Sequence, residues 1–294
     1  MAHLAPRGLI VSAARSFLVR IVDRETKSHA RGLDDHALAL VLALRALGCE
    51  AHLHHELPEE RPEARLVVLG LSDADPGFFV PPDAVLYNSE QVLSGQHWKN
   101  LDRYKDNPLW DYSREQVHWF RARGARGAVH CPVGFVPGTD RIGPSPVEDI
   151  DVLFYGWVCE RRREVIEALT RAGLRVRWLV GVFGRERDRL VARSKVVLNL
   201  HFYERPVFEI FRVGHLLASG RCVVSEDGGV DPELESLARR ATAYTPRGEI
   251  VRACRDLVAS QTAREEVALR GREAFREVDF VQNVREALAR SGGG

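Results

Sequence analysis

The stretch HFYERPVFEIFRVGHLLASGRCVVSE, from His201 to Glu226, decides how the second half of the chain folds. Its middle predicts a helix over residues 206–219, apolar on nearly every face and flanked by runs rich in β-branched residues. Glu209, Arg212 and His215 nevertheless recur three residues apart along this helix. The stretch therefore predicts a strand–helix–strand unit whose polar stripe faces a ligand or another charged group.

The composition indicates a folded protein with a real core. The chain has 294 residues, of which 45% are hydrophobic and 28% charged, so we expect one large or two ordinary domains. A net charge of +1 predicts neither a nucleic-acid partner nor an anionic membrane surface. The five cysteines include no CxxC pair, which argues against a disulfide framework or a zinc site. We see no signal peptide and no apolar run near the ~20 residues of a membrane helix, so we expect a cytoplasmic protein.

Strand and helix patterns alternate along the first half of the chain. The patterns predict strands at 8–13, 17–23, 49–54, 64–71, 84–90 and 127–135 and helices at 34–48 and 113–124. Ser113 is the expected N-cap of the second helix. The stretch VPGTDRIGPSPVED, residues 136–149, is rich in Pro and Gly and reads as a linker.

A second alternating series follows the linker. It predicts strands at 149–156, 174–181, 195–201 and 221–226 and helices at 160–173, 185–194, 206–219, 248–259, 262–276 and 279–289. We therefore expect an α/β protein of two Rossmann-like, doubly wound domains that face a cleft. The expected boundaries are 1–138 and 148–278, with a C-terminal helix at 279–290 that packs back on the first domain.

Ligands of such sheets bind at the carboxyl ends of strands, so the residues there are the first candidates. Gly156 ends one strand and permits a tight turn, and Arg161, Arg162 and Arg163 begin the helix that follows. Arginines in a first helical turn oppose the helix dipole, whereas a bound phosphate would favour one or two of them. The alternative is a solvated basic face.

Later strand ends carry further candidates. Gly184, in a glycine-containing loop, would let a flat nucleobase approach the backbone, although a plain turn explains it equally well. Asn199 and His201 follow one strand, and Ser225 and Glu226 end the next. All are candidate substrate-binding residues.

The polar stripe has two interpretations of its own. Glu209 and Arg212 are one turn apart and could pair with each other. Alternatively, Glu209 faces the cleft and accepts hydrogen bonds from both hydroxyls of a ribose, for which a carboxylate has the necessary two oxygens. Arg212 would then orient Glu209 or reach a phosphate.

The segment SKVVLNLHFYERPVFEIFRVGHLLASGRCVVSED resembles the nucleotide-sugar half of bacterial GT-B glycosyltransferases. LFYGWVCERRREVIEALTRAG resembles the first strand–helix unit of that half. Three more stretches resemble segments of the first half in a branch of short bacterial transferases: LYNSEQV, LWDYS and CPVGF. The resemblance covers at least residues 84–260 and rests on a pattern rather than on one diagnostic motif.

The resemblance implies a hexosyltransferase-like enzyme that moves a sugar from a nucleoside diphosphate, most often UDP or dTDP, to an acceptor hydroxyl or amine. The acceptor would be a small molecule, a glycan or a protein. The sequence shows no convincing metal cluster, and its arginines could neutralise the leaving diphosphate, so we expect neither a metal nor another cofactor. Carried over by position, Glu209 would hold the ribose and an arginine among 161–163 the diphosphate. Many relatives carry a second Glu near LASG, where this chain has Gly214–His215. This difference puts the two-Glu arrangement, and the retaining mechanism linked with it, in doubt.

The first half should then bind the acceptor, and an inverting mechanism needs a base there. Asp34, Asp35 and His36 begin a helix after a loop with Gly32 and are the candidates, although helix capping also explains an aspartate at this place. Glu90, after the strand AVLYN, is the next candidate.

Three alternatives to a metal-independent transferase stay open. Asp73 and Asp75 form a DxD that could hold a divalent metal, though DADPG also reads as a turn. The protein could be a non-catalytic nucleotide-sugar binder or an activator subunit. It could also be a nucleotide-sugar epimerase of the same architecture. The sequence lacks GxxxxGK[ST], GxGxxG and GxSxG, which argues against P-loop NTPases, Rossmann dehydrogenases and α/β-hydrolases.

Overall fold

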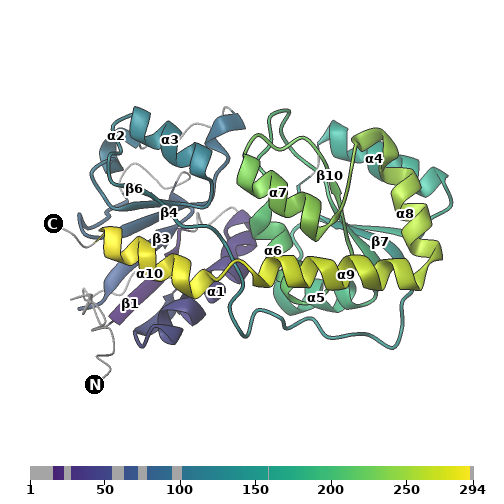
Figure 1. Ribbon diagram of the computed structural model, residues 1–294, viewed down its shortest axis with the longest axis horizontal. Helices are drawn as coiled ribbons and strands as arrows, with labels where there is room; N and C mark the ends of the chain where they lie inside the picture. The colour runs from purple at the N-terminus through teal and green to yellow at the C-terminus, as the bar shows by residue number, and fades with distance from the viewer. Residues whose placement is uncertain are drawn as a thin grey trace, which may run out of the picture.

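Two parallel sheets, one in each half of the chain, organise the computed structural model (Figure 1). The structure describes residues 16–22, 28–54, 63–71, 78–94, 101–157 and 159–291. We use N-terminal half for the part that contains the first sheet and C-terminal half for the part that contains the second. The expected α/β class with two doubly wound sheets is confirmed.

The first sheet has six parallel strands in the order β2-β1-β3-β4-β5-β6. The strands are β1 (Ser16–Ile21), β2 (Glu50–His54), β3 (Arg65–Leu69), β4 (Val85–Asn88), β5 (Leu109–Asp111) and β6 (Ala128–His130). The connecting helices are η1 (Ser28–Leu33), α1 (Asp34–Ala46), η3 (Val92–Ser94), α2 (Leu101–Tyr104) and α3 (Arg114–Ala122). Successive side chains of a strand point to opposite faces, so Phe17 and Val19 pack on the side of α1, whereas Leu18 packs on the side of α3. Both faces are therefore covered, as parallel sheets require.

The second sheet has five parallel strands in the order β11-β10-β9-β7-β8. The strands are β7 (Ile150–Tyr155), β8 (Val176–Leu179), β9 (Ser194–Asn199), β10 (Val223–Glu226) and β11 (Ala243–Thr245). The helices are α4 (Glu160–Arg171), α5 (Gly184–Ala192), α6 (Ile210–Ala218), α7 (Pro232–Ala241), η4 (Arg247–Glu249), α8 (Ile250–Ala259) and α9 (Gln261–Arg276). Helices α4 and α8 share one apolar cluster with the sheet, and α5, α6, α7 and α9 share another on its opposite face.

The chain crosses between the halves twice, at neighbouring places. Phe135 pairs with Asp279 at this crossing, and the Phe135 amide donates to the carbonyl of Val278 at 2.8 Å. A Cβ on Gly134 would lie 2.2 Å from that carbonyl oxygen, so only glycine fits there. After the crossing, α10 (Phe280–Ser291), yellow in Figure 1, lies against α1 and β6 of the N-terminal half.

One hydrophobic cluster continues through both halves. It contains Leu40 of α1, Leu216 of α6 and Val284 of α10, each fully or almost fully buried. The halves therefore meet through an apolar contact between α1 and α6 as well as through polar groups at the rim.

Local predictions succeeded in some places and failed in others. The Ser113 hydroxyl caps α3 by accepting from the amide of Gln116 at 3.2 Å, as predicted. Capping of α1 by an aspartate is wrong, because η1 runs directly into α1 and makes Leu33 the N-cap. The helix predicted at 206–219 begins only at Ile210. The four residues before it, 206–209, belong to neither a helix nor a strand, and within them the Val207 amide donates to the Gln91 side chain at 2.8 Å. The strand predicted at 8–13 lies outside the described residues.

Candidate active site

A cleft of about 310 Å³ opens between the halves, at the carboxyl ends of strands from both sheets. Residues that follow β1, β3, β4 and β5 form one wall, and residues that follow β7 and β8, together with α6, form the other. Pockets that bury a small ligand typically measure about 300–1,000 Å³. Among the predicted site residues, those in the cleft walls are Asp35, Glu90, Gly156, Glu209 and Arg212.

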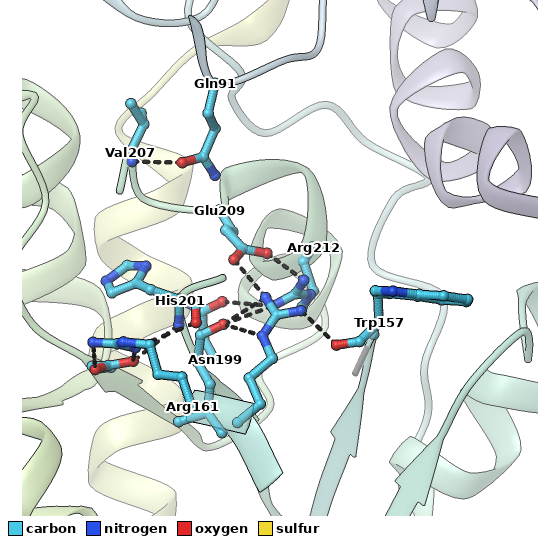
Figure 2. Close-up of polar contacts among 12 residues, drawn as sticks. Gln91, Trp157, Arg161, Asn199, His201, Val207, Glu209 and Arg212 are labelled. Carbon is cyan, nitrogen blue, oxygen red and sulfur yellow. Dashed lines mark hydrogen bonds and ion pairs between the residues drawn. The ribbon is translucent and has the colours of Figure 1, made fainter. Parts of the chain in front are cut away.

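Glu209 is held by two arginines (Figure 2). It is the N-cap residue of α6, and its carboxylate pairs with Arg212 on one side and accepts from Arg162 at 2.8 Å on the other. Burial alone would raise the pKa of Glu209, but the two guanidiniums hold the pKa below its usual value. The carboxylate is therefore a fixed anion in the cleft wall.

Arg162 is a buried structural residue, 2% exposed. Besides Glu209, its guanidinium donates to the carbonyl of Leu200 at 2.7 and 3.1 Å and to that of Trp157 at 2.8 Å. It thereby ties together the ends of β7 and β9. These contacts use donors that the phosphate interpretation would have needed.

The position of the Arg212 side chain depends on Gly156, the glycine that was predicted to end the first strand after the linker. Gly156 has φ +144, and a Cβ there would lie 3.1 Å from the Arg212 guanidinium. Arg212 also makes long contacts of 3.4 Å to the Asn199 side chain and to the carbonyl of Leu200. The Asn199 amide in turn donates to Ser225 at 3.0 Å, which links the ends of β9 and β10. Gly156 therefore leaves room for the Arg212 head group against the backbone.

Arg161 forms a second charged cluster beside the cleft but outside its walls. Its guanidinium pairs with both oxygens of Glu226, one of which, Oε2, also accepts from the His201 backbone amide at 3.0 Å. Glu226 and His201 are each 1% exposed. Arg163 instead points to solvent and pairs with Glu160 at 3.0 Å. The three adjacent arginines thus have three different environments, and none of them lines the cleft.

Asp35 and His215 meet across the cleft. The nearest atoms, Asp35 Oδ2 and His215 Nδ1, are 3.8 Å apart, and Tyr155 lies 3.2 Å from the other imidazole nitrogen. Burial would raise the pKa of Asp35, but His215 and the guanidiniums of Arg187 and Arg141 hold it well below its usual range. Burial lowers the pKa of His215 to about 4. At neutral pH an anionic carboxylate therefore faces a neutral imidazole.

The other two residues of the predicted base cluster lie outside the cleft walls. His36 is 3% exposed and packs edge-on against the rings of Tyr87 and Phe211. Burial lowers its pKa to about 3, so it is a neutral core residue. Asp34 is half-buried and lies 3.8 Å from Arg31 one turn before it.

The loop after β4 brings Glu90 and Gln91 into the wall of the N-terminal half. The Asn88 side chain fixes this loop by donating to the Glu90 carbonyl at 2.9 Å and accepting from the Glu90 amide at 3.1 Å. Asn88 is itself held by Asp111 at 2.7 Å. The Gln91 side chain accepts from Val207 across the cleft, as Figure 2 shows.

Sequence reasoning missed several residues of the C-terminal wall. Trp157, directly after β7, is 54% exposed at the cleft, and Phe183 precedes α5. Gly184, which was predicted to approach a base, is the first residue of α5, with φ +57. Arg187, on the same helix, is 3% exposed. The strand-end rule could have identified Trp157, but no local signal marks Arg187.

The described residues offer neither a metal-binding cluster nor a helix that could span a membrane. Across the described ranges, no three His, Cys, Asp or Glu side chains are grouped so that they could hold a metal ion. Asp73 and Asp75 lie outside those ranges. No helix in the described part of the chain has the length and apolarity needed to cross a membrane.

Sequence relatives of this chain have no assigned function. No known protein-family profile matches it. One uncharacterized protein of Acanthamoeba polyphaga mimivirus is 32% identical over 171 residues, which is 55% of this chain and 19% of the relative. Another is 26% identical over 174 residues, 57% of this chain and 56% of the relative. The chain thus spans less than two thirds of these relatives, and their viral source does not support the expected bacterial origin.

Solved structures match almost the whole chain. WaaG, a glycosyltransferase involved in lipopolysaccharide biosynthesis, has a TM-score of 0.57 at 12% identity and covers 94% of this chain and 100% of its own. AviGT4, a glycosyltransferase involved in avilamycin A biosynthesis, gives 0.54 at 16% identity, with 94% and 98% covered. T4 phage BGT in complex with UDP-glucose gives 0.51 at 10% identity, with 92% and 98% covered.

The chain has the GT-B fold. The expected resemblance is confirmed at the level of the fold, which is what likeness at these identities shows. The cleft of this GT-B fold lies between the two sheets, where each presents the carboxyl ends of its strands. The roles of the predicted site residues stay predictions.

Proposed function

We propose that this protein is a metal-independent glycosyltransferase that moves a sugar from UDP or dTDP to an acceptor hydroxyl or amine. The observation that carries the proposal is a GT-B fold with a cleft of ligand size at the strand ends of both sheets. Among its structural neighbours, T4 phage BGT was solved with UDP-glucose. A small molecule, a glycan or a protein is the proposed acceptor, and the cytoplasm is the proposed location.

In this proposal the C-terminal half binds the donor. Trp157 offers an exposed ring on which a base can stack, and Arg212 offers a cation beside the glycine turn at Gly156. Glu209 is proposed as the ribose ligand, which requires the hydroxyls to share or replace its contacts with Arg162 and Arg212. Arg212, which lines the cleft, is proposed to neutralise the diphosphate; an arginine among 161–163 would have to leave its present partners to do so.

The acceptor comes from the other wall. Its oxygen or nitrogen attacks the anomeric carbon, the bond to the diphosphate oxygen breaks, and the acceptor proton passes to a base. Glu90 is the proposed base among the predicted candidates. Asp35 is bound by two arginines and has a lowered pKa, and His36 is buried among aromatic rings, so both are poor proton acceptors. Asp34 remains an alternative.

A donor screen with two matched variants tests this proposal. Thermal shift and donor hydrolysis are measured with UDP-, dTDP- and GDP-sugars, with and without EDTA. Trp157→Ala should weaken binding of the best donor by about 1–3 kcal/mol, the usual contribution of a stacked base. Phe79→Ala is the control, since Phe79 is 51% exposed and outside the cleft walls. Equal affinity in both variants, or turnover that EDTA abolishes, would contradict the proposal.

A second candidate function is nucleotide-sugar binding without transfer. The observation that favours it is the pairing of two cleft carboxylates, Asp35 and Glu209, each with two arginines, which leaves both as weak bases. Tight binding of a nucleotide sugar with no hydrolysis and no transfer to any acceptor class would support this candidate.

A further inference from the structure

Two carboxylates and two guanidiniums form a closed ring at the edge of the cleft. Arg187 donates to Asp35 at 2.6 Å and to Asp188 at 2.6 and 3.0 Å. Arg141 donates to Asp188 at 3.0 Å and pairs with the second oxygen of Asp35. Charges of opposite sign therefore alternate around the ring, and its members sum to zero.

Three of the four ring members are largely shielded from water, whereas the side chain of Arg141 is 31% exposed. The side chains of Arg187 and Asp35 are 3% and 7% exposed, and that of Asp188 is 13% exposed. The guanidinium of Arg187 also stacks over the ring of Tyr155, with 5.4 Å from its central carbon to the ring centroid. Such buried charges are held strongly by their partners, and removal of one partner leaves an uncompensated ion.

The members of the ring come from three separate parts of the chain. Asp35 lies on α1 of the N-terminal half, and Arg187 and Asp188 lie on α5 of the C-terminal half. Arg141 belongs to the stretch between the halves, which was predicted as a linker. Asp35 is therefore the ring member from the N-terminal half, and both of its pairs connect that half to the rest of the molecule.

Other polar contacts also join the two halves. The Gln91 side chain accepts from the Val207 amide at 2.8 Å, and the Ser113 hydroxyl donates to Asp231 at 2.5 Å. The first contact joins two uncharged groups, and the second joins a hydroxyl to a buried carboxylate. The ion pair between Arg114 and Glu233 is about half exposed on both sides, where such pairs contribute little.

We propose that the Asp35–Arg187–Asp188–Arg141 ring is a latch that holds the two halves together across the cleft. Asp35 joins the N-terminal half to the latch and acts as a positioning residue rather than as the proton acceptor. Because Asp35 and Arg187 both line the cleft, the latch would control access to the site that the proposed function uses. This proposal depends on the proposed function only for the identity of the ligand that enters the cleft.

Limited proteolysis with trypsin measures how often the latch is open. Trypsin cuts after arginine and can bind Arg141 only when its side chain is free of its ion-pair partners. The rate of cleavage at Arg141 is followed by the fragment that begins at Ile142, and small-angle scattering gives the radius of gyration. Asp35→Asn should speed this cleavage about tenfold or more and expand the molecule, since cleavage follows the population of open molecules.

Asp188→Asn is the matched control. It removes the same charge from the same ring, together with one of the two partners of Arg141, but leaves both pairs of Asp35 across the halves, so it should speed cleavage much less than Asp35→Asn does. Equal acceleration in both variants, or none in either, would overturn the latch.

A double variant distinguishes opening of the latch from misfolding of Asp35→Asn. Asp35→Asn combined with Arg187→Gln removes the uncompensated cation, so it should fold while Arg141 stays easily cut. Slow cleavage in this folded double variant would also overturn the proposal. Because no nucleotide is used, this experiment is independent of the donor screen. If the latch is found but no donor binds, only the proposed function is contradicted. If a donor binds but no latch is found, only this inference is contradicted.

Discussion

Replacement of Glu209 by Gln removes one negative charge from between two arginines while it keeps the shape of the side chain. Glu209 is 12% exposed, and Arg162, which donates to it at 2.8 Å, is 2% exposed. Arg162 cannot turn toward water without giving up its bonds to the carbonyls of Leu200 and Trp157. The variant therefore leaves a buried guanidinium short of its counter-ion.

Loss of one partner from a buried ion pair costs about 3–5 kcal/mol of unfolding free energy. At about 2 °C for each kcal/mol in a chain of this size, the melting temperature should fall by roughly 6–10 °C. Glu160→Gln is the matched control on the neighbouring pair. Glu160 and Arg163 are 71% and 47% exposed, so that change should cost at most about 1 kcal/mol.

The assay is a thermal melt of both variants, followed by calorimetric titration with the best nucleoside diphosphate. A Glu209→Gln melting temperature no lower than that of Glu160→Gln would refute the argument from burial. If only the affinity of Glu209→Gln for the nucleoside diphosphate fell, by about 1.5–3 kcal/mol, the Glu209 carboxylate would be a ribose ligand whose ion pairs are not needed for stability. If stability alone fell, its role would be structural.

Two further predictions concern the base and the pH dependence. Glu90→Gln should lower turnover roughly 100- to 10,000-fold with donor affinity unchanged, and equal turnover in Glu90→Gln and wild type would return the role to Asp34, Asp35 or His36. Burial lowers the pKa of His36 to about 3, whereas the unfolded chain binds this proton near pH 6.5, so stability should fall as pH drops below 6.5, by about 1.4 kcal/mol per pH unit. His215, with a pKa lowered to about 4, adds to this slope, as do His201 and His130, whose pKa values burial also lowers. His36→Phe should therefore reduce, but not abolish, the loss of stability measured by urea midpoints between pH 6 and 5. An unchanged slope in His36→Phe would show that this imidazole does not stay neutral in the fold.

The sequence by itself determined the α/β class, most of the strands and the position of the cleft at strand ends. These features rest on local signals: the two-residue period of strands, the 3.6-residue period of helices, and caps such as Ser113. The sequence-based prediction missed strands β5 and β11, which have only three residues each and so show little periodicity. It also missed α7, although Asp231 as N-cap and Pro232 in the first turn are local signals of a helix start.

Only the tertiary structure decided what the polar stripe does. The sequence offered Arg212 as the partner of Glu209, but Arg162, 47 residues earlier, is the second one. His215 faces Asp35 of the other half, and Asp35 is held by Arg187, 152 residues away. The sequence places charges along a helix, but which opposite charge compensates each of them depends on how separate elements pack. Burial makes an unpaired charge costly, so the fold selects pairs that no spacing along the chain can predict.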